Sequence, residues 1–199
     1  MNGPGVIVYL HGFNSSPQSI KARQFGQYLQ DRGLGDQWFC PALPPSGDEA
    51  IAIIERAVAA RPRGSLTFVG SSLGGFYATW LAEKYKARAV LINPAITPHL
   101  GLRDYLGEQS NIYTGERYHL TEAHLQEWEK LLVPAITPSH YLLLVETGDE
   151  LLDYREAVTR YAGACQVVVE GGDHSLQSFP RHIPAILEFA GFPSDVSRI

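Results

Sequence analysis

The stretch "FVGSSLGGFYATW" (residues 68–80) joins an apolar run to a helix-forming run through a cluster of glycines and two adjacent serines. The pattern G-x-S-x-G fits it only when Ser72 is the central serine. Ser71 would need glycines where the chain has Val69 and Leu73. A turn tight enough to lift a serine off the end of a strand brings its flanking residues so close that side chains would clash. The stretch therefore predicts a strand, a sharp turn at Ser72 and a helix, although a turn without chemistry would use the same glycines.

Short β-branched runs alternate with helical patterns along the rest of the chain. The middle runs are continuously apolar, which is typical of parallel strands buried on both faces. Strands are predicted at 6–10, 37–43, 65–70, 87–93, 140–147 and 165–171. Helices are predicted from Ser16 as N-cap and Pro17 to about Gly33, at 47–60, after the glycine cluster, at 153–164 and at 180–192. The alternation predicts one α/β domain over residues 1–199, with about six parallel strands and helices on both faces.

One interval breaks this alternation, because residues 96–139 occupy a place where a short crossover would suffice. The interval is rich in aromatic residues and has its own helical pattern at 121–132. Long excursions of this kind are often lids or binding loops. We therefore expect a lid, with Tyr105, Tyr113 and Trp128 as candidate substrate contacts. The alternative is that these rings only pack the interval onto the core.

A serine nucleophile needs a base and an acid that orients the base. Asp149 follows the fifth predicted strand, just past Gly148, and His174 follows paired glycines after the sixth. The chain order Ser72, Asp149, His174 is the order used by α/β folds with this turn. Because parallel strands end at one edge of their sheet, we expect the three side chains to converge there.

Three other acidic residues compete with Asp149 for the role of acid. Asp153 is expected to lie in the following helix, and Glu146 to end the strand. Asp173 adjoins His174 in the chain, and neighbouring side chains usually diverge. A structural or exposed role is the expectation for five further histidines: His99, His119, His124, His140 and His182.

Donors for an oxyanion are expected at the end of the first strand, in "YLHGFNSSP" (residues 9–17). The predicted donors are the backbone N–H groups of Phe13 and of Leu73. His11 is then a residue that packs the turn. Asn14 either contacts substrate or helps to start the helix, and Asn93 is a further candidate substrate contact.

Composition excludes several classes of protein. The 199 residues carry a net charge of −5 with acids and bases scattered, so no basic face for nucleic acid is expected. No apolar run is long enough to span a bilayer, and the first five residues lack the basic start of a secretory leader. These features predict a cytoplasmic protein.

Cysteine and histidine spacings give no sign of a metal site. Cys40 and Cys165 are far apart and form no C-x-x-C pair, so both are predicted to be free thiols buried in the core. The chain has no H-E-x-x-H pattern and no cysteine cluster. We therefore expect no metal and no organic cofactor.

Taken together, several segments resemble the YqiA-like bacterial esterases of the α/β-hydrolase superfamily. They run from Tyr9 to Ser175 and read "YLHGFNSSP", "VGSSLGGFYATWLA", "NPA", "DYLGE…YTGE", "TGDELLDYREAV" and "EGGDHS". The resemblance implies a cytosolic serine esterase acting on short acyl esters and on acyl-CoA thioesters. It also implies Ser72 as nucleophile, Asp149 as acid and His174 as base.

The resulting hypothesis is a serine esterase that hydrolyses small-molecule esters through an acyl-enzyme on Ser72. A peptidase or a long-chain lipase with the same triad is one alternative. A ligand-binding module that keeps the fold without catalysis is another, since fold alone does not determine function. The natural substrate, the acyl chain length and the oligomeric state stay open at this point.

Overall fold

The computed structural model describes residues 5–193, and at its centre is a six-stranded sheet. The strands lie in the order β2-β1-β3-β4-β7-β8, and each neighbouring pair is parallel. Their bounds are β1 Val6–Leu10, β2 Trp38–Phe39, β3 Leu66–Ser71, β4 Arg88–Ile92, β7 Tyr141–Glu146 and β8 Cys165–Val169. The predicted α/β fold with about six parallel strands is confirmed.

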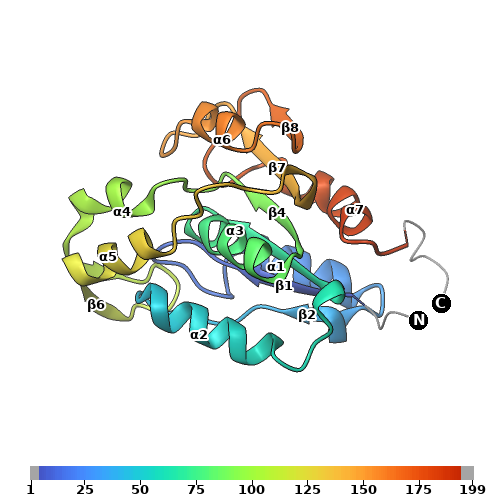
Figure 1. Ribbon diagram of the computed structural model, residues 1–199, viewed down its shortest axis with the longest axis horizontal. Helices are drawn as coiled ribbons and strands as arrows, with labels where there is room; N and C mark the ends of the chain where they lie inside the picture. Colours follow the sequence, from blue (N-terminus) through green and yellow to red (C-terminus); the bar gives the residue numbers. More distant parts are fainter. Residues whose placement is uncertain (1–4, 194–199) are drawn as a thin grey trace.

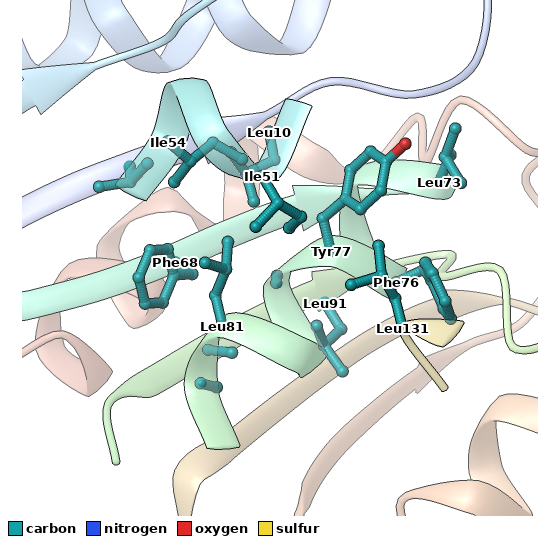
Figure 2. Close-up of a cluster of buried hydrophobic side chains, with 14 of the residues drawn as sticks. Leu10, Ile51, Ile54, Phe68, Leu73, Phe76, Tyr77, Leu81, Leu91 and Leu131 are labelled. Atoms are coloured by element: carbon teal, nitrogen blue, oxygen red, sulfur yellow. The ribbon is translucent and has the colours of Figure 1, made fainter. Parts of the chain in front are cut away.

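Helices cover both faces of this sheet (Figure 1). The first face carries α2 Gly47–Val58, α3 Leu73–Tyr85 and α6 Tyr154–Arg160, and the second carries α1 Ile20–Gln30 and α7 Phe179–Phe189. Successive residues of a strand point to opposite faces, so Val8 and Leu10 join the first apolar cluster while Ile7 and Tyr9 join the second. Figure 2 shows the first cluster, in which side chains of strands and helices interdigitate. Short 3₁₀ turns complete the main body at η1 Gly35–Gln37, η2 Arg63–Ser65 and η4 Pro138–His140.

The start of the first helix and the length of the second strand differ from prediction. Helix α1 begins at Ile20 with Ser19 as its N-cap, whereas the Ser16 hydroxyl accepts the N–H of Gln18 in a turn before it. Strand β2 contains only Trp38 and Phe39. The prolines that soon follow lack the N–H needed to continue a ladder, so the strand ends early.

The prediction that both cysteines are buried in the core is wrong. Cys165 is exposed and Cys40 is partly buried, and both are free thiols. Cys165 begins β8 and Cys40 follows β2, and these are the two edge strands of the sheet. An edge strand has a neighbour on one side only, so its residues are less enclosed. Desolvation nevertheless raises the pKa of the Cys40 thiol to about 12.

The interval 96–139 is an ordered structure between β4 and β7. It contains α4 Pro98–Gly101, the 3₁₀ turn η3 Arg103–Tyr105, the antiparallel hairpin of β5 Gly107–Ser110 and β6 Arg117–Leu120, and α5 Glu122–Lys130. Figure 1 shows α4, α5 and β6 together at the left of the molecule. Leu125 and Trp128 of α5 are buried in the first apolar cluster, which docks this interval onto the helices beneath it.

The described part of the chain contains neither a membrane-spanning helix nor a cluster of metal-binding side chains. Between residues 5 and 193, no helix is long and apolar enough to cross a membrane. In the same range, no group of three or more His, Cys, Asp or Glu side chains is arranged to hold a metal ion. The prediction that the first five residues lack the basic start of a secretory leader concerns residues 1–4, which lie outside the described range.

Candidate active site

The turn between β3 and α3 holds Ser72 in a backbone conformation that is rare for a residue with a side chain. Its φ is 55° and its ψ is −121°, in the region that favours glycine. A Cβ added to Gly70 would lie 2.1 Å from the carbonyl oxygen of Gly74. One added to Gly74 would lie 2.0 Å from the carbonyl oxygen of Leu10. Both glycines are thus required by close backbone approach, as the sequence pattern predicts.

His174 and Asp149 form a hydrogen-bonded pair at the same edge of the sheet. The Nδ1 atom of His174 lies 3.0 Å and 2.9 Å from the two carboxylate oxygens of Asp149. The Asp149 side chain is only 2% exposed. Because a carboxylate can only accept, Nδ1 carries the hydrogen, and Nε2 of a neutral imidazole is then the atom able to take up a proton.

The environment of Asp149 keeps its carboxyl group ionised. Burial by itself would raise the pKa of this group. The hydrogen bonds from His174 and from the backbone N–H groups of Leu152 and Leu151 outweigh burial and hold the pKa below its ordinary value. An ionised Asp149 at neutral pH fixes the tautomer of His174 and would stabilise its protonated form.

Backbone contacts bring the Ser72 turn close to the His174 loop. The N–H of Ser72 donates to the carbonyl oxygen of Ile92 at 3.0 Å. Asn93, the residue that follows Ile92, donates through Nδ2 to the carbonyl oxygen of His174 at 3.1 Å. Among residues 5–193 no hydrogen bond joins Ser72 Oγ to the imidazole itself. Catalytic hydrogen bonds of this kind often tighten only when substrate is bound.

The loop after β1 passes directly beside Ser72. A Cβ added to Gly12 would lie 3.2 Å from Cβ of Ser72 and 3.7 Å from its Oγ. Phe13 follows Gly12, and Leu73 is the first residue of α3, where backbone N–H groups have no partner in a preceding turn. Gly12 and Ser72 form this contact, and the two N–H groups predicted as oxyanion donors belong to the residues that directly follow them, Phe13 and Leu73.

The competing residues have other roles in the structure. His11 is buried, accepts the N–H of Leu43 through Nε2 and bonds the Gly12 carbonyl through Nδ1, and burial lowers its pKa. Its side chain therefore links the loop after β1 to the segment after β2, as expected for a residue that packs the turn. Asp153 does not lie inside a helix but caps α6, where its carboxylate accepts the N–H of Arg155.

The structure shows that two of the expected substrate contacts, Asn14 and Trp128, have hydrogen-bond partners within the protein. Asn14 donates through Nδ2 to Gln109 at 2.9 Å and accepts the hydroxyl of Tyr118 through Oδ1 at 2.6 Å. Both polar ends of Asn14 are thus used to hold the β5–β6 hairpin. Trp128 is fully buried, and its Nε1 donates to the hydroxyl of Tyr77 at 2.7 Å. Trp128 is therefore a core residue and not a wall of the site.

Asn93 is likewise hydrogen-bonded within the protein, and one of its partners is a residue whose role the sequence did not indicate. Asn93 is 2% exposed and bonds the carbonyls of Asp173 and His174 and the N–H of Glu146. Glu146 is 1% exposed, although it was expected only to end a strand. The one local signal for it is an acidic residue at the end of an otherwise apolar buried strand.

The buried Glu146 carboxylate organises the loop that carries His174. One oxygen accepts the N–H groups of Asp173 and Gln177, each at 3.0 Å, and the other accepts the N–H of Ser178 at 2.9 Å. Together with Asn93, this carboxylate binds the loop on both sides of His174. Burial by itself would raise the pKa of Glu146, but these hydrogen bonds outweigh it and hold the pKa below its ordinary value.

These hydrogen bonds predict an acid-dependent contribution of Glu146 to stability. A carboxyl group with a depressed folded-state pKa contributes stability above its unfolded-state pKa and loses it as the pH falls through the folded-state value. Glu146→Gln is therefore expected to lower the free energy of unfolding at neutral pH, with the difference from wild type shrinking as the pH falls below the ordinary glutamate pKa of about 4.3. Urea unfolding at a series of pH values measures both quantities.

The matched control for this experiment is Glu170→Gln. Glu170 is exposed and follows the neighbouring strand, so its replacement is expected to leave the free energy of unfolding nearly unchanged at every pH. A stability difference for Glu146→Gln that stays constant from neutral to acid pH would contradict the role given to the buried carboxylate. The negative charge of Glu146 also interacts with Lys21 and His182. Both of these residues are unchanged in the two variants.

Comparison with known proteins places this chain in a family. Residues 6–191 match the sequence profile described as "Uncharacterised protein family (UPF0227)". This chain belongs to the UPF0227 family. The matched range covers every strand and helix described above, so the family assignment applies to the whole fold. It confirms the resemblance to YqiA-like proteins drawn from the motifs.

Solved structures similar to this UPF0227 member are α/β-hydrolases. A candidate hydrolase from Agrobacterium vitis S4 has a TM-score of 0.75 at 19% identity, over 96% of this chain and 89% of that one. Alpha/beta hydrolase domain-containing protein 10 from mouse has a TM-score of 0.68 at 18% identity, over 96% and 90%. A monoacylglycerol lipase from Paleococcus ferrophilus has a TM-score of 0.64 at 18% identity, over 99% and 96%. At these identities the likeness establishes the α/β-hydrolase fold.

Proposed function

We propose that this protein is a serine hydrolase that cleaves carboxylic esters through an acyl-enzyme on Ser72. The observation that carries the proposal is the hydrogen-bonded pair of Asp149 and His174, held at the sheet edge where Ser72 occupies a strained turn. A buried, ionised acid behind a neutral histidine is the arrangement that activates a serine hydroxyl. A ligand-binding module would have no need of it.

The proposed mechanism uses only these groups. Nε2 of His174 takes the proton of Ser72 Oγ as that oxygen attacks the acyl carbon, and Asp149 stabilises the imidazolium that forms. The N–H groups of Phe13 and Leu73 bind the oxyanion of the tetrahedral intermediate. His174 then protonates the leaving alcohol or thiol. Water, activated by the same histidine, releases the acid from Ser72.

Small acyl esters are the proposed substrates, with acyl thioesters as a second group. Solved structures of this fold include an esterase domain of a Rhodothermus marinus protein and the monoacylglycerol lipase from Paleococcus ferrophilus. The motif resemblance to YqiA-like esterases supports the same class of bond. Thioesters fit the mechanism because a thiolate leaves at least as readily as an alkoxide.

A fluorophosphonate probe tests the proposal directly, because it reacts with activated serines. We expect covalent labelling of wild-type protein at Ser72, located by peptide mass mapping, and hydrolysis of one or more members of a panel of acyl esters and thioesters. Ser72→Ala should not be labelled. Absence of both labelling and hydrolysis in the wild type would favour the non-catalytic binding module.

We further propose that residues 96–139 form a lid within the single domain of this chain. The hairpin of this interval is hydrogen-bonded to Asn14, and the ring of Tyr105 lies edge-on to Phe13 with 6.1 Å between ring centroids. The interval therefore contacts the loop that carries a proposed oxyanion donor. Tyr105 and Tyr113 are 49% and 41% exposed and remain candidates for substrate contact.

The aromatic residues of the lid are expected to fall into two groups on mutation. Trp128→Ala should lower the free energy of unfolding by about 3–5 kcal/mol, because a fully buried ring and its hydrogen bond to Tyr77 are lost. Tyr105→Ala and Tyr113→Ala should cost little stability and should change the ratio of activities on short and longer acyl chains. Denaturant unfolding and kcat/KM on paired esters measure the two effects.

The outcome for the exposed tyrosines decides whether the interval acts as a lid. Tyr105→Ala and Tyr113→Ala could instead lower the stability and leave the ratio of activities on short and longer acyl chains unchanged. These rings would then only pack the interval onto the rest of the protein, and the lid proposal would be wrong.

A further inference from the structure

The loop of residues 170–178 connects β8 to α7 and carries His174. It belongs to neither a strand nor a helix, so its backbone groups take their hydrogen-bond partners from elsewhere in the protein. Two buried side chains supply some of these partners. Glu146 accepts the N–H groups of residues 173, 177 and 178, and Asn93 donates to the carbonyl oxygens of residues 173 and 174. A third side chain, from the first turn of α1, holds the residue that follows His174.

Lys21 is this third side chain. It is partly buried, and its Nζ donates to the carbonyl oxygen of Ser175 at 2.7 Å, across 154 residues of sequence. The ring of Phe25, one turn further along α1, lies edge-on to that of Phe179 at the start of α7, with 6.0 Å between ring centroids. Helix α1 is therefore packed beside the end of the loop, and Lys21 reaches the residue after His174 from a rigid element.

Burial is the largest influence on the charge of Lys21. It lowers the pKa of the ammonium to about 8, against the attraction of three carboxylates, those of Asp173, Glu146 and Asp149. Because this pKa lies below its ordinary value, the unfolded chain holds the proton more tightly, and the charge costs the fold stability relative to the neutral amine. Lysine ordinarily keeps its ammonium in water. A role in the site therefore explains the position of this ammonium better than a role in stability does.

We propose that Lys21 is a positioning residue for His174, an assignment that rests on the proposed function. Its hydrogen bond fixes the carbonyl group directly after the histidine, as Asn93 fixes the carbonyl group of the histidine itself. Transfer of the Ser72 proton requires Nε2 of the imidazole within hydrogen-bond distance of Oγ. A displacement of about 1 Å in such a group can cost about 100-fold in rate. Release of the loop at Ser175 would therefore slow the chemical step without removing any group that takes part in it.

The test variant is Lys21→Met, which keeps an unbranched apolar stem and removes the donor and its charge. We expect kcat on a reactive short-chain ester to fall by about 10- to 100-fold, with KM within about twofold of wild type, because contacts to substrate are unchanged. The rate at which a fluorophosphonate labels Ser72 should fall by the same factor, since that reaction uses the same base. The melting temperature should stay level or rise, because a partly buried charge is removed. A residue that only docked α1 would lower the melting temperature and leave kcat unchanged.

Two further variants serve as controls. Lys21→Arg retains a cationic donor at this position and should keep most of the wild-type kcat. Arg23→Met removes a cation from an exposed position on the same helix, so its kcat should equal that of wild type. Lys21→Leu replaces Lys21→Met if melting shows that the latter does not fold, and the same loss of kcat is expected of it.

The outcomes separate this assignment from the proposed function. A kcat within about twofold of wild type in folded Lys21→Met overturns the positioning role and leaves the esterase proposal standing. A rise in KM with kcat unchanged overturns it too, because Lys21 would then contact substrate. The same holds if Lys21→Arg loses as much kcat as Lys21→Met, since a retained donor should hold the loop. No hydrolysis of any ester by wild type removes the proposed function and this assignment with it.

Discussion

Ser72→Ala is expected to reduce ester turnover by about 10⁴- to 10⁶-fold while leaving the fold intact. The hydroxyl is the only group removed, and without it no acyl-enzyme can form. The backbone bonds of Ser72 to Ile92 and Ala95 do not involve the side chain, and alanine retains the Cβ. Steady-state kcat on a reactive ester measures the loss, and thermal melting shows whether the variant stays folded.

Ser71→Ala is the matched control for this prediction. Ser71 is the last residue of β3 and is buried, so its hydroxyl is not available to a substrate in the way required of a nucleophile. Most of the wild-type activity should remain in this variant. If Ser71→Ala lost activity and Ser72→Ala kept it, the register of the turn proposed as the nucleophile site would be wrong.

Asp149→Asn should lower turnover by about 10⁴-fold. The carboxylate of Asp149 accepts from Nδ1 of His174, which keeps Nε2 free to take the serine proton. An amide at this position can donate to Nδ1, which favours the tautomer with the hydrogen on Nε2. The imidazolium also loses its charged partner. The loss should appear in kcat, and the melting temperature should fall as well, because the ionised carboxylate also accepts hydrogen bonds that stabilise the fold. Circular dichroism at the assay temperature shows that the variant is folded when its kcat is measured.

Asp153→Asn is the control that distinguishes the two candidate acids. Asp153 caps α6 by accepting the N–H of Arg155, and asparagine is an equally good N-cap. Its activity should stay within about tenfold of wild type. A larger loss at Asp153 than at Asp149 would transfer the role of acid to Asp153.

Local patterns in the sequence were sufficient to predict the fold and to propose the catalytic residues. The alternation of apolar runs and helical patterns predicts parallel strands with helices on both faces, because each element must bury its apolar side against the next. Gly70 and Gly74 mark the turn at Ser72, since only glycine fits where backbones touch. The end of each parallel strand at one sheet edge then brings the residues after β7 and β8 near that turn.

Only the tertiary structure decided which residues support the site and which belong to the core. The hydrogen-bond partner of Trp128, Tyr77, is 51 residues away in the sequence. Tyr118, which donates to Asn14, is 104 residues away from it. Asn93 bonds the carbonyl of His174 across 81 residues, and Glu146 binds N–H groups about 30 residues further along. A periodicity or a motif reports on neighbours within a few residues. The partner of a buried polar group is selected by the packing of distant elements, which no local pattern contains.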